Sequence, residues 1–484
     1  MSIRVIDSEI RILQQSTRMP FRYGIATMTE FPLLFLRLGV EVDGVRELGV
    51  ASDLLPPKWF TKEPNKDSVE EIDEMLEVIE SAVGLVQELE GASVFDLWLK
   101  LYRRQGQVGD MKGYPPLLAH FGTSLVERAL IDAFCRIKQR SFSSLVYLNG
   151  FEVKLGEIHA ELADLHPSDL LPPVPLSRIV ARHTVGLGDP LNSDTIPDAE
   201  RADDGLPQAL SDCIKEYGLT HFKIKISGDI QVDLPRLMET FEVIEENTAS
   251  AVRYTLDGNE QFISTEAFQQ YWKELESAKW FPSFFRDLLF IEQPLHRDVA
   301  LSHSVAGLLG TRGGSHPKLI IDESDGELDA LPRALELGYD GTSHKNCKGV
   351  FKGLANRCLI EKRQREKPER SLLMSGEDLC NQGPVGLLQD LAVMACLGIE
   401  SVERNGHHYC RGLSGFSKPL QQEVLSHHSD LYREMEEGWI TLQLEKGLID
   451  LKSINQSPFG VGFRMPLDGI DSVEEWKRKR GEAG

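Results

Sequence analysis

The stretch "HFKIKISGD", residues 221–229, places two lysines two positions apart inside the pattern of a buried strand. In an extended strand the side chains alternate between two faces, so Lys223 and Lys225 point to one face and the apolar residues beside them point to the other. Two ammonium groups on one face are typical of a solvated edge strand. The alternative is a functional pair, and the strands that follow favour it.

The composition is that of a large globular protein. The chain has 484 residues, of which 41% are hydrophobic and 26% are charged, a length typical of two domains or of one large barrel with additions. The 75 acidic and 53 basic residues give a net charge of −22, which repels nucleic acid phosphates and anionic membrane surfaces. We therefore expect neither nucleic acid nor a membrane as a partner.

Cysteine usage and the start of the chain predict a cytoplasmic protein. The seven cysteines are odd in number, scattered and free of C-x-x-C pairs, a pattern typical of free thiols in a reducing compartment. The first residues, "MSIRVIDSEIRIL", alternate like a strand and lack the apolar centre of a signal peptide. No apolar run is long enough to span a bilayer.

From about residue 176 the chain alternates between strand and helix patterns. "LSRIVARHTV" (176–185) is the first strand of this series and "SVERN" (401–405) is the last, which makes about eight strands joined by helices. Such alternation forms parallel β/α units, and eight of them close a barrel. We predict an α/β fold of three parts: an α+β unit over residues 1–175, a barrel over 176–415, and a segment, 416–484, that returns to pack on the first unit.

Three stretches make the chain longer than such a barrel requires. Residues 185–207 are rich in Gly, Pro and Asp, and they predict a loop. We expect two further extra loops, near residues 275–288 and 302–317.

Acidic residues follow the apolar part of three consecutive predicted strands. Asp257 ends "TLD", Glu292 ends "FIE" and Asp322 ends "LIID", at spacings of about one β/α unit. Because the carboxyl ends of barrel strands meet at one mouth, these acids converge there, with Lys225 on the strand before and Lys345 on the strand after. One such acid is commonly a helix N-cap, but three on consecutive strands suit a hard cation such as Mg²⁺.

In this order the motifs resemble those of the enolase superfamily, specifically the mandelate racemase/muconate lactonizing enzyme family. The resemblance covers nearly the whole chain and depends on five motifs: K-x-K (Lys223, Lys225), D-x-N (Asp257, Asn259), E-Q-P (Glu292), D-E-S (Asp322, Glu323, Ser324) and the strand with Lys345. Each motif alone is weak, whereas the ordered set is specific.

The resemblance implies an enzyme with a (β/α)7β barrel, capped by an α+β domain built from both chain ends. It implies Asp257, Glu292 and Asp322 as ligands of Mg²⁺. It also implies Lys225 and Lys345 as acid/base groups on opposite faces of the substrate, with Lys223 as the neighbour that tunes Lys225. The expected partner is a small carboxylic acid, and we expect a homo-oligomer.

Physical chemistry agrees with these roles. A lysine at its reference pKa of about 10.4 is a poor base near neutral pH. A second ammonium nearby and partial burial both favour the neutral, basic form of Lys225. Removal of the proton next to a carboxylate gives an enediolate, whose charge a divalent cation stabilises. We therefore predict an isomerase or lyase: a racemase, an epimerase or a dehydratase. Because Arg404, His407, His408 and Tyr409 are expected at the barrel mouth, we favour a hydroxylated carboxylic acid as its substrate.

Two strands depart from patterns of related subgroups. The seventh, "SLLMSGEDL", carries Glu377 where the mandelate racemase subgroup has its His base, which favours the lysine type. The eighth lacks the D-x-D of dipeptide epimerases, which argues against a dipeptide substrate. The expected substrate contacts are polar residues near the barrel mouth and in the N-terminal segment over it: Asn259, Glu323, Glu377, Arg22, Tyr23, Arg404, His407 and His408.

Other interpretations stay open at this point. A cycloisomerase of the muconate-lactonizing type uses the same groups, and a non-catalytic relative keeps the fold as a binding protein. That relative should have lost a metal ligand or a lysine, and this chain has lost none. His407, His408 and Cys410 also suggest a zinc site, but a fourth ligand and the usual spacing are missing.

Overall fold

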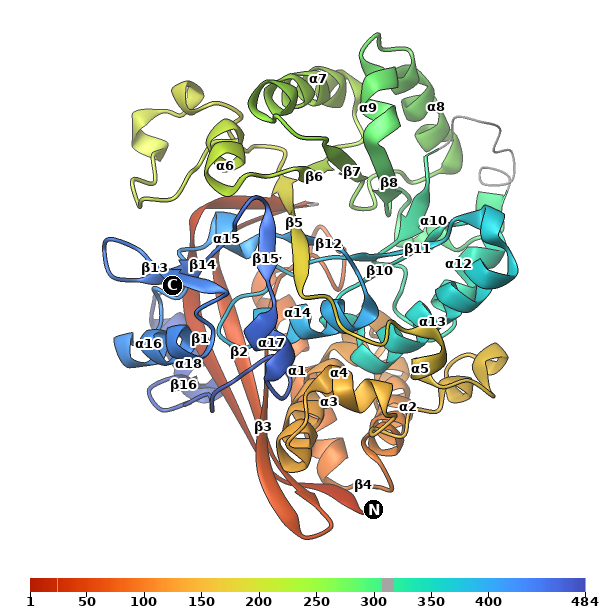
Figure 1. Cartoon of the computed structure of the whole chain (residues 1–484), viewed down its shortest axis with the longest axis vertical. Coiled ribbons are helices and arrows are strands. Elements are labelled where there is room, and N and C mark those ends of the chain that lie inside the picture. Colours follow the sequence, from red (N-terminus) through yellow and green to blue (C-terminus); the bar gives the residue numbers. More distant parts are fainter. Residues whose placement is uncertain (24, 307–316, 484) are drawn as a thin grey trace.

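The computed structural model describes residues 1–23, 25–306 and 317–483, and Figure 1 shows their arrangement. The chain begins with a meander of three long antiparallel strands, drawn in red. Their inward-facing residues are almost all apolar, which is why one face of this sheet is buried. The strands are β1 (Ile3–Tyr23), β2 (Ala26–Val42) and β3 (Val45–Leu54), and the short β4 (Glu90–Gly91) pairs with β1.

Helices cover the sheet. They are α1 (Ser68–Gln87), α2 (Val94–Lys112) and α3 (Pro116–Lys138), followed by the short α4 (Phe142–Tyr147) and α5 (Pro167–Leu170). α3 is buried along nearly its whole length, because it lies between the sheet and the other two helices. Its Arg128 is fully buried and donates a hydrogen bond of 2.7 Å to Asp53 on β3, which ties the helix to the sheet.

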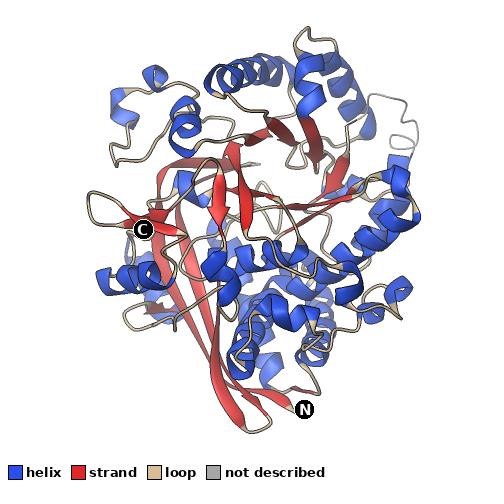
Figure 2. Cartoon of the chain, viewed as in Figure 1, coloured by secondary structure: helices blue, strands red, loops and turns tan. Residues whose placement is uncertain are grey.

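Eight parallel strands close a barrel, because the last of them pairs with the first. Figure 2 shows the strands surrounded by helices. The strands are β5 (Arg178–Val185), β6 (His221–Lys225), β7 (Arg253–Asp257), β8 (Leu288–Glu292), β9 (Leu319–Ile321), β10 (Gly341–His344), β11 (Leu373–Gly376) and β12 (Ser401–Arg404). The predicted barrel is confirmed.

The helices between these strands follow the predicted order. They are α6 (Leu210–Tyr217), α7 (Ile230–Asn247), α8 (Thr265–Glu276), α9 (Phe281–Asp287), α10 (Arg297–Ala300), α12 (Ala330–Leu337), α13 (Val350–Glu366) and α14 (Gly386–Leu397). The short α15 (Gly406–Tyr409) follows the last strand of the barrel. Buried apolar residues on these helices pack against the outside of the barrel strands.

The extra stretches differ in structure. Residues 186–209 contain only two single 3-10 turns, as expected of a loop. The loop predicted near 275–288 is wrong, because residues 281–287 form α9; an aromatic cluster stabilises this helix, with Phe281 and Phe284 buried and Phe281 packed on Trp272. Most of the stretch near 302–317 lies outside the described residues.

The end of the chain returns to both earlier parts. Its elements are α16 (Lys418–His427), β13 (Tyr432–Glu434), β14 (Ile440–Leu442), β15 (Leu448–Asp450), α17 (Lys452–Gln456), β16 (Asp471–Ser472) and α18 (Val473–Ala483). β16 pairs antiparallel with β1, and Trp476 of α18 donates a hydrogen bond of 2.9 Å to Gln14 on β1. β15 instead pairs antiparallel with β5 of the barrel. The domain boundaries at 175 and 415 stay a prediction.

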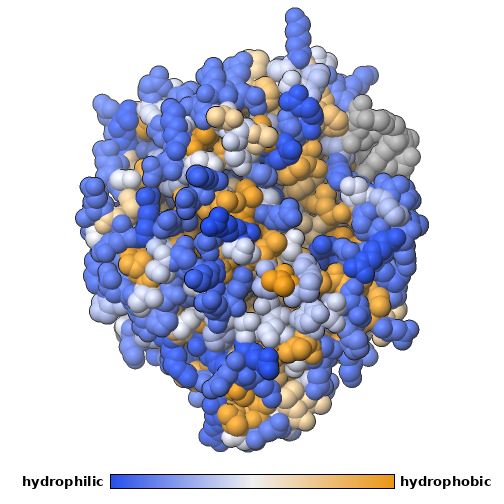
Figure 3. All heavy atoms as spheres, in the orientation of Figure 1, coloured by the Kyte–Doolittle hydropathy of each residue, from blue (hydrophilic) through white to orange (hydrophobic). Residues whose placement is uncertain are grey.

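Hydrophilic residues form most of the surface on the face shown in Figure 3, and hydrophobic residues show through in patches. Among the described residues, every helix is too short or too polar to cross a lipid bilayer. The cytoplasmic location and the homo-oligomeric state stay predictions.

The contact between α1 and α3 depends on Gly122. A Cβ atom at this position would lie 2.1 Å from the carbonyl oxygen of Val78 on α1, closer than any real contact. We expect Gly122→Ala to reduce the free energy of unfolding by about 1–3 kcal/mol, because the two helices must move apart. Thermal or denaturant unfolding measures the change.

Gly84 on α1 is the matched control, since a Cβ there meets nothing within 4 Å. Gly84→Ala should be neutral or stabilising, because alanine is favoured over glycine inside a helix by about 1 kcal/mol. Equal stability of the two variants would contradict the close approach of α1 and α3.

Candidate active site

Two lysines face each other across the barrel. Lys225 is the last residue of β6, and Lys345 directly follows β10. In the closed order β5 to β12, four steps separate β6 from β10 in either direction, so the two strands lie on opposite sides of the barrel. Both lysines line the same pocket, and both are buried.

The register of the strands explains why residues distant in the sequence meet at the carboxyl end of the barrel. Lys225 on β6 pairs with Asp257 on β7, and Asp257 pairs with Glu292 on β8. Each of the three is the last residue of its strand, so their side chains project from one rim of the barrel. Asp322 follows β9 directly and continues the series.

Lys223 lies at the centre of the charged cluster. Its Nζ is 2.9 Å from Asp257 Oδ2, 2.6 Å from Glu292 Oε2, 2.7 Å from Glu377 Oε2 and 3.0 Å from Glu403 Oε2. Burial alone would lower the pKa of Lys223, but the four carboxylates outweigh it and raise that pKa well above its usual value. The ammonium group is therefore charged, and it holds the carboxylates together.

The two opposed lysines have separate partners. Lys225 Nζ donates to Asp257 Oδ2 at 2.5 Å and to Asn259 Oδ1 at 2.9 Å. Lys345 Nζ donates to Asp322 Oδ2 and lies 5.0 Å from the centre of the Trp59 ring. Each ammonium is thus positioned by a carboxylate at its own side of the pocket.

The acids differ in their electrostatic surroundings. Burial and the neighbouring Glu377 raise the pKa of Glu292 well above its usual value, although Lys223 opposes this. Asp322 shows the reverse: burial would raise its pKa, but Lys345 and Lys348 hold it well below the usual range. Lys348 Nζ donates to Asp322 Oδ1 at 3.0 Å. Some of these acids are therefore already neutralised by lysines, whereas Glu292 is left short of positive charge.

The chemistry of the predicted metal ligands is consistent with a cation site. Asp257, Glu292 and Asp322 are hard carboxylate donors on neighbouring strands, as Mg²⁺ prefers. Both carboxylate oxygens of Glu292 are buried and accept no hydrogen bond from the described residues. The three acids are not among the described groups whose ligand atoms all lie within 4.8 Å of one another, and the Lys223 ammonium lies against both Asp257 and Glu292. The donor set fits Mg²⁺, which would bind Asp257, Glu292 and Asp322.

The pocket has a polar side and an apolar side. The barrel contributes mainly charged and polar residues, and the N-terminal segment contributes apolar and aromatic ones. The lining residues are Lys223, Lys225, Asp257, Asn259, Lys345, Asp378, Leu379, Cys380, Glu403 and Asn405 from the barrel, and Phe21, Tyr23, Met28, Pro56 and Trp59 from the N-terminal segment.

Of the expected substrate contacts, the structure brings Tyr23 and Asn259 to this pocket. The other six do not line it: Arg22, Glu323, Glu377, Arg404, His407 and His408. Arg404 is fully buried and donates to Asp390 at 2.6 Å, so its charge is already paired. Burial and the adjacent Asp322 raise the pKa of Glu323 to about 8, behind the lining residues. We leave these six out of the proposed substrate site.

Strand alternation explains the misplacement of Arg404. Successive residues of a strand point to opposite faces, so Glu403 and Arg404 cannot both face the barrel interior. Glu403 does, and it contacts Lys223 and accepts a hydrogen bond of 2.7 Å from Thr184. Counting alternation from Val402, which is fully buried in the core, would have found Glu403 from the sequence.

Comparison with family models and with curated proteins gives no match. Solved structures match over nearly the whole chain. A mandelate racemase/muconate lactonizing protein from Herpetosiphon aurantiacus has a TM-score of 0.60 at 14% identity, covering 96% of this chain and 99% of its own. A dipeptide epimerase from Enterococcus faecalis, complexed with Mg and L-Leu-L-Tyr, has a TM-score of 0.57 at 14% identity, covering 93% and 97%.

A third match is an N-succinyl Arg/Lys racemase from Bacillus cereus, with a TM-score of 0.55 at 13% identity, covering 94% of this chain and 98% of its own. The chain therefore has the fold of the mandelate racemase and muconate lactonizing enzymes of the enolase superfamily. The resemblance read from the sequence motifs is confirmed at the level of the fold.

The cluster around Lys223 predicts a stability effect that a divalent cation reverses. Lys223→Ala leaves four carboxylates without their shared ammonium, and loss of one partner of a buried pair costs about 3–5 kcal/mol. In EDTA we expect the melting temperature of Lys223→Ala to lie below that of the wild type. In Mg²⁺ the difference should shrink, because a bound cation replaces the lost charge. Scanning fluorimetry in both buffers measures this.

Lys352→Ala is the control. Lys352 is equally buried and pairs with Asp325 at 3.0 Å, but it does not line the pocket. This variant should lose stability, and Mg²⁺ should raise its melting temperature no more than it raises that of the wild type. A response of Lys223→Ala no larger than that of Lys352→Ala would contradict the replacement of the lost ammonium by the cation.

Proposed function

We propose that this protein is a Mg²⁺-dependent enzyme that removes the proton α to a carboxylate and returns a proton to the same carbon, as a racemase or epimerase. The observation that carries the proposal is the opposition of Lys225 and Lys345 across one pocket, with three carboxylates on the strands between them. Two such groups on opposite sides are what inversion at a carbon requires, since the proton leaves one face and arrives at the other.

The roles of the chain's residues follow from their contacts. In one direction the Nζ of Lys225 takes the α-proton and the ammonium of Lys345 donates one, and in the other direction they exchange roles. Asp257 and Asn259 hold Lys225 in position, and Asp322 holds Lys345. When bound by Asp257, Glu292 and Asp322, Mg²⁺ would neutralise the negative charge that develops on the substrate's carboxylate oxygens.

The lining of the pocket bears on the substrate. The hydroxylated acid expected from Arg404, His407 and His408 loses its support, because these residues lie outside the pocket. The residues above the lysines are aromatic or apolar instead, among them Phe21 and Trp59. We therefore favour a carboxylic acid whose distal part is apolar or aromatic, which such side chains bind by excluding water.

Racemisation or epimerisation is preferred over the alternatives. A racemase and an epimerase are among the proteins of the same fold, which supports the proposal. Dehydration needs a leaving hydroxyl, and the apolar lining favours no such group. A non-catalytic binding protein would not need two opposed lysines together with a buried Glu292 that shares the Lys223 ammonium with three other carboxylates.

Exchange of the α-proton with solvent tests the function. Carboxylic acids with an α-proton and an apolar or aryl group, free or N-acylated, are incubated with the protein and Mg²⁺ in D₂O and followed by proton NMR. We expect deuterium at the α-carbon of at least one class. With an acid that exchanges, Lys225→Ala should slow α-proton exchange from one enantiomer by about 10²–10⁴-fold. Lys345→Ala should slow exchange from the other enantiomer by a similar factor.

Lys225→Arg is the matched control for charge. Arginine keeps the cation beside Asp257 but stays protonated in proteins, so it cannot act as a base. This variant should fold with wild-type stability and still fail to exchange the proton. Exchange at near wild-type rates in both alanine variants would overturn the proposal, and the lysines would then be structural.

A further inference from the structure

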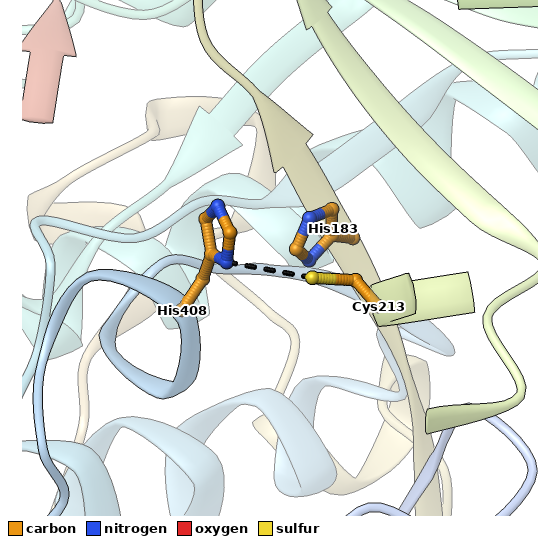
Figure 4. Close-up of side chains that lie close together, drawn as sticks. All are labelled: His183, Cys213 and His408. Carbon is orange, nitrogen blue, oxygen red and sulfur yellow. Dashed lines mark hydrogen bonds between the residues drawn. The ribbon is translucent and has the colours of Figure 1, made fainter. Parts of the chain in front are cut away.

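A second cluster of ligating side chains lies outside the pocket. His183 comes from β5, Cys213 from α6 and His408 from α15, and their side chains converge on one point, as Figure 4 shows. All three are buried. One ligand atom from each lies within 4.8 Å of the other two, and among the described residues this is the group that meets that spacing.

The spacing of sulfur and nitrogen matches a shared metal ion. Cys213 Sγ lies 3.6 Å from His408 Nδ1, the contact drawn as a dashed line in Figure 4. With zinc–sulfur and zinc–nitrogen bonds of about 2.3 and 2.0 Å and a tetrahedral angle, two ligands of one zinc ion lie about 3.5 Å apart. The same distance suits a weak thiol–imidazole hydrogen bond, so the distance alone does not decide.

In both histidines the second ring nitrogen, which points away from the proposed metal position, also has a polar neighbour. His183 Nδ1 lies 3.1 Å from His407 Nε2, which leaves Nε2 of His183 for a metal. His408 presents Nδ1 to Cys213, and its Nε2 lies 3.9 Å from Asp189 Oδ2. Ligand histidines commonly have their other ring nitrogen held by a hydrogen-bond partner, as His407 holds His183, whereas the Asp189 contact of His408 is too long for a hydrogen bond.

The cluster is buried, and the cation beside it is paired. Burial lowers the pKa of His183 and of His408 and raises the pKa of the Cys213 thiol, so a bound metal ion would have to displace the thiol proton. Arg18 is the nearby cation, and Asp204 neutralises it through two hydrogen bonds of 2.7 Å. Arg18 also donates to the carbonyl oxygen of His408, which links β1 to the cluster.

We propose that His183, Cys213 and His408 bind one zinc ion, with a fourth position left for water. A thiol and two imidazoles are borderline-soft donors that suit zinc and not Mg²⁺, so this site is separate from the carboxylate site. Binding displaces the thiol proton of Cys213 to solvent, and no other bond changes. The zinc ion would connect the first barrel strand, the helix after the 186–209 loop and the turn after the last strand.

This assignment differs from the zinc site suggested by the sequence. His407, His408 and Cys410 are close in sequence, but His407 serves as the partner of His183. Cys410 does not belong to the group of convergent ligands. A cysteine from a distant helix, Cys213, takes the place that Cys410 held in that interpretation.

The test measures zinc and cobalt on the full chain. Protein refolded or expressed with zinc, then dialysed in excess Mg²⁺ to occupy the carboxylates, should retain about one zinc per chain by elemental analysis. Cobalt(II) in its place should give the visible bands of a tetrahedral ion and a thiolate-to-cobalt charge-transfer band. Both readouts use the wild-type chain, so they do not depend on whether a variant folds.

The variants locate the ion. Cys213→Ser and His408→Gln should lower retained zinc at least tenfold, and Cys213→Ser should abolish the charge-transfer band. Cys396→Ser, at another buried free cysteine on α14, should leave both unchanged. Failure of wild-type protein to retain zinc under either loading condition, or retention of the charge-transfer band in Cys213→Ser, would overturn the proposal. Activity is not the readout, so failure of the proposed function leaves this result unaffected.

Discussion

Four carboxylates converge on the ammonium of Lys223 in the interior of the barrel, away from solvent. Unpaired, these acids would repel one another strongly, because buried charges are poorly screened. The lysines at the barrel mouth are therefore required by the acids as much as by any reaction. Glu292, whose oxygens accept no hydrogen bond from the described residues, marks where this compensation is incomplete. A divalent cation would complete it.

The barrel and the N-terminal segment supply different kinds of side chain to the same pocket. The barrel supplies the charged groups, whose positions are fixed by strand register. The N-terminal segment supplies Phe21, Tyr23 and Trp59, which come from a strand and a loop of the other sheet. In the proposed enzyme, substitutions in the N-terminal segment would therefore alter substrate preference without disturbing the electrostatic balance at the strand ends. Trp59 is the point of contact between the two, since its ring lies beside Lys345.

The barrel and its charged rim were predictable from the sequence because their signals are local. Each acid follows a short apolar run, so Asp257 and Glu292 are visible without knowledge of the fold. Side-chain direction was harder: Glu403 and Arg404 are adjacent, and only alternation decides which one faces inward. The sequence around α9 does not indicate a helix by itself, because the partners of its aromatic residues, such as Trp272, lie on another helix. Cys213 and His183 carry no spacing motif, since three separate elements bring them to His408.

Pairing of the chain ends has a consequence for synthesis. The edge of β1 is paired by β16, and α18 is joined to the same strand through Trp476 and Gln14. β1 is therefore translated long before β16, the segment that pairs with its edge. Until then its edge exposes unpaired backbone groups, which other chains can join. This sheet is complete only once β16 has been translated, and until then the net charge of −22 opposes association between emerging chains.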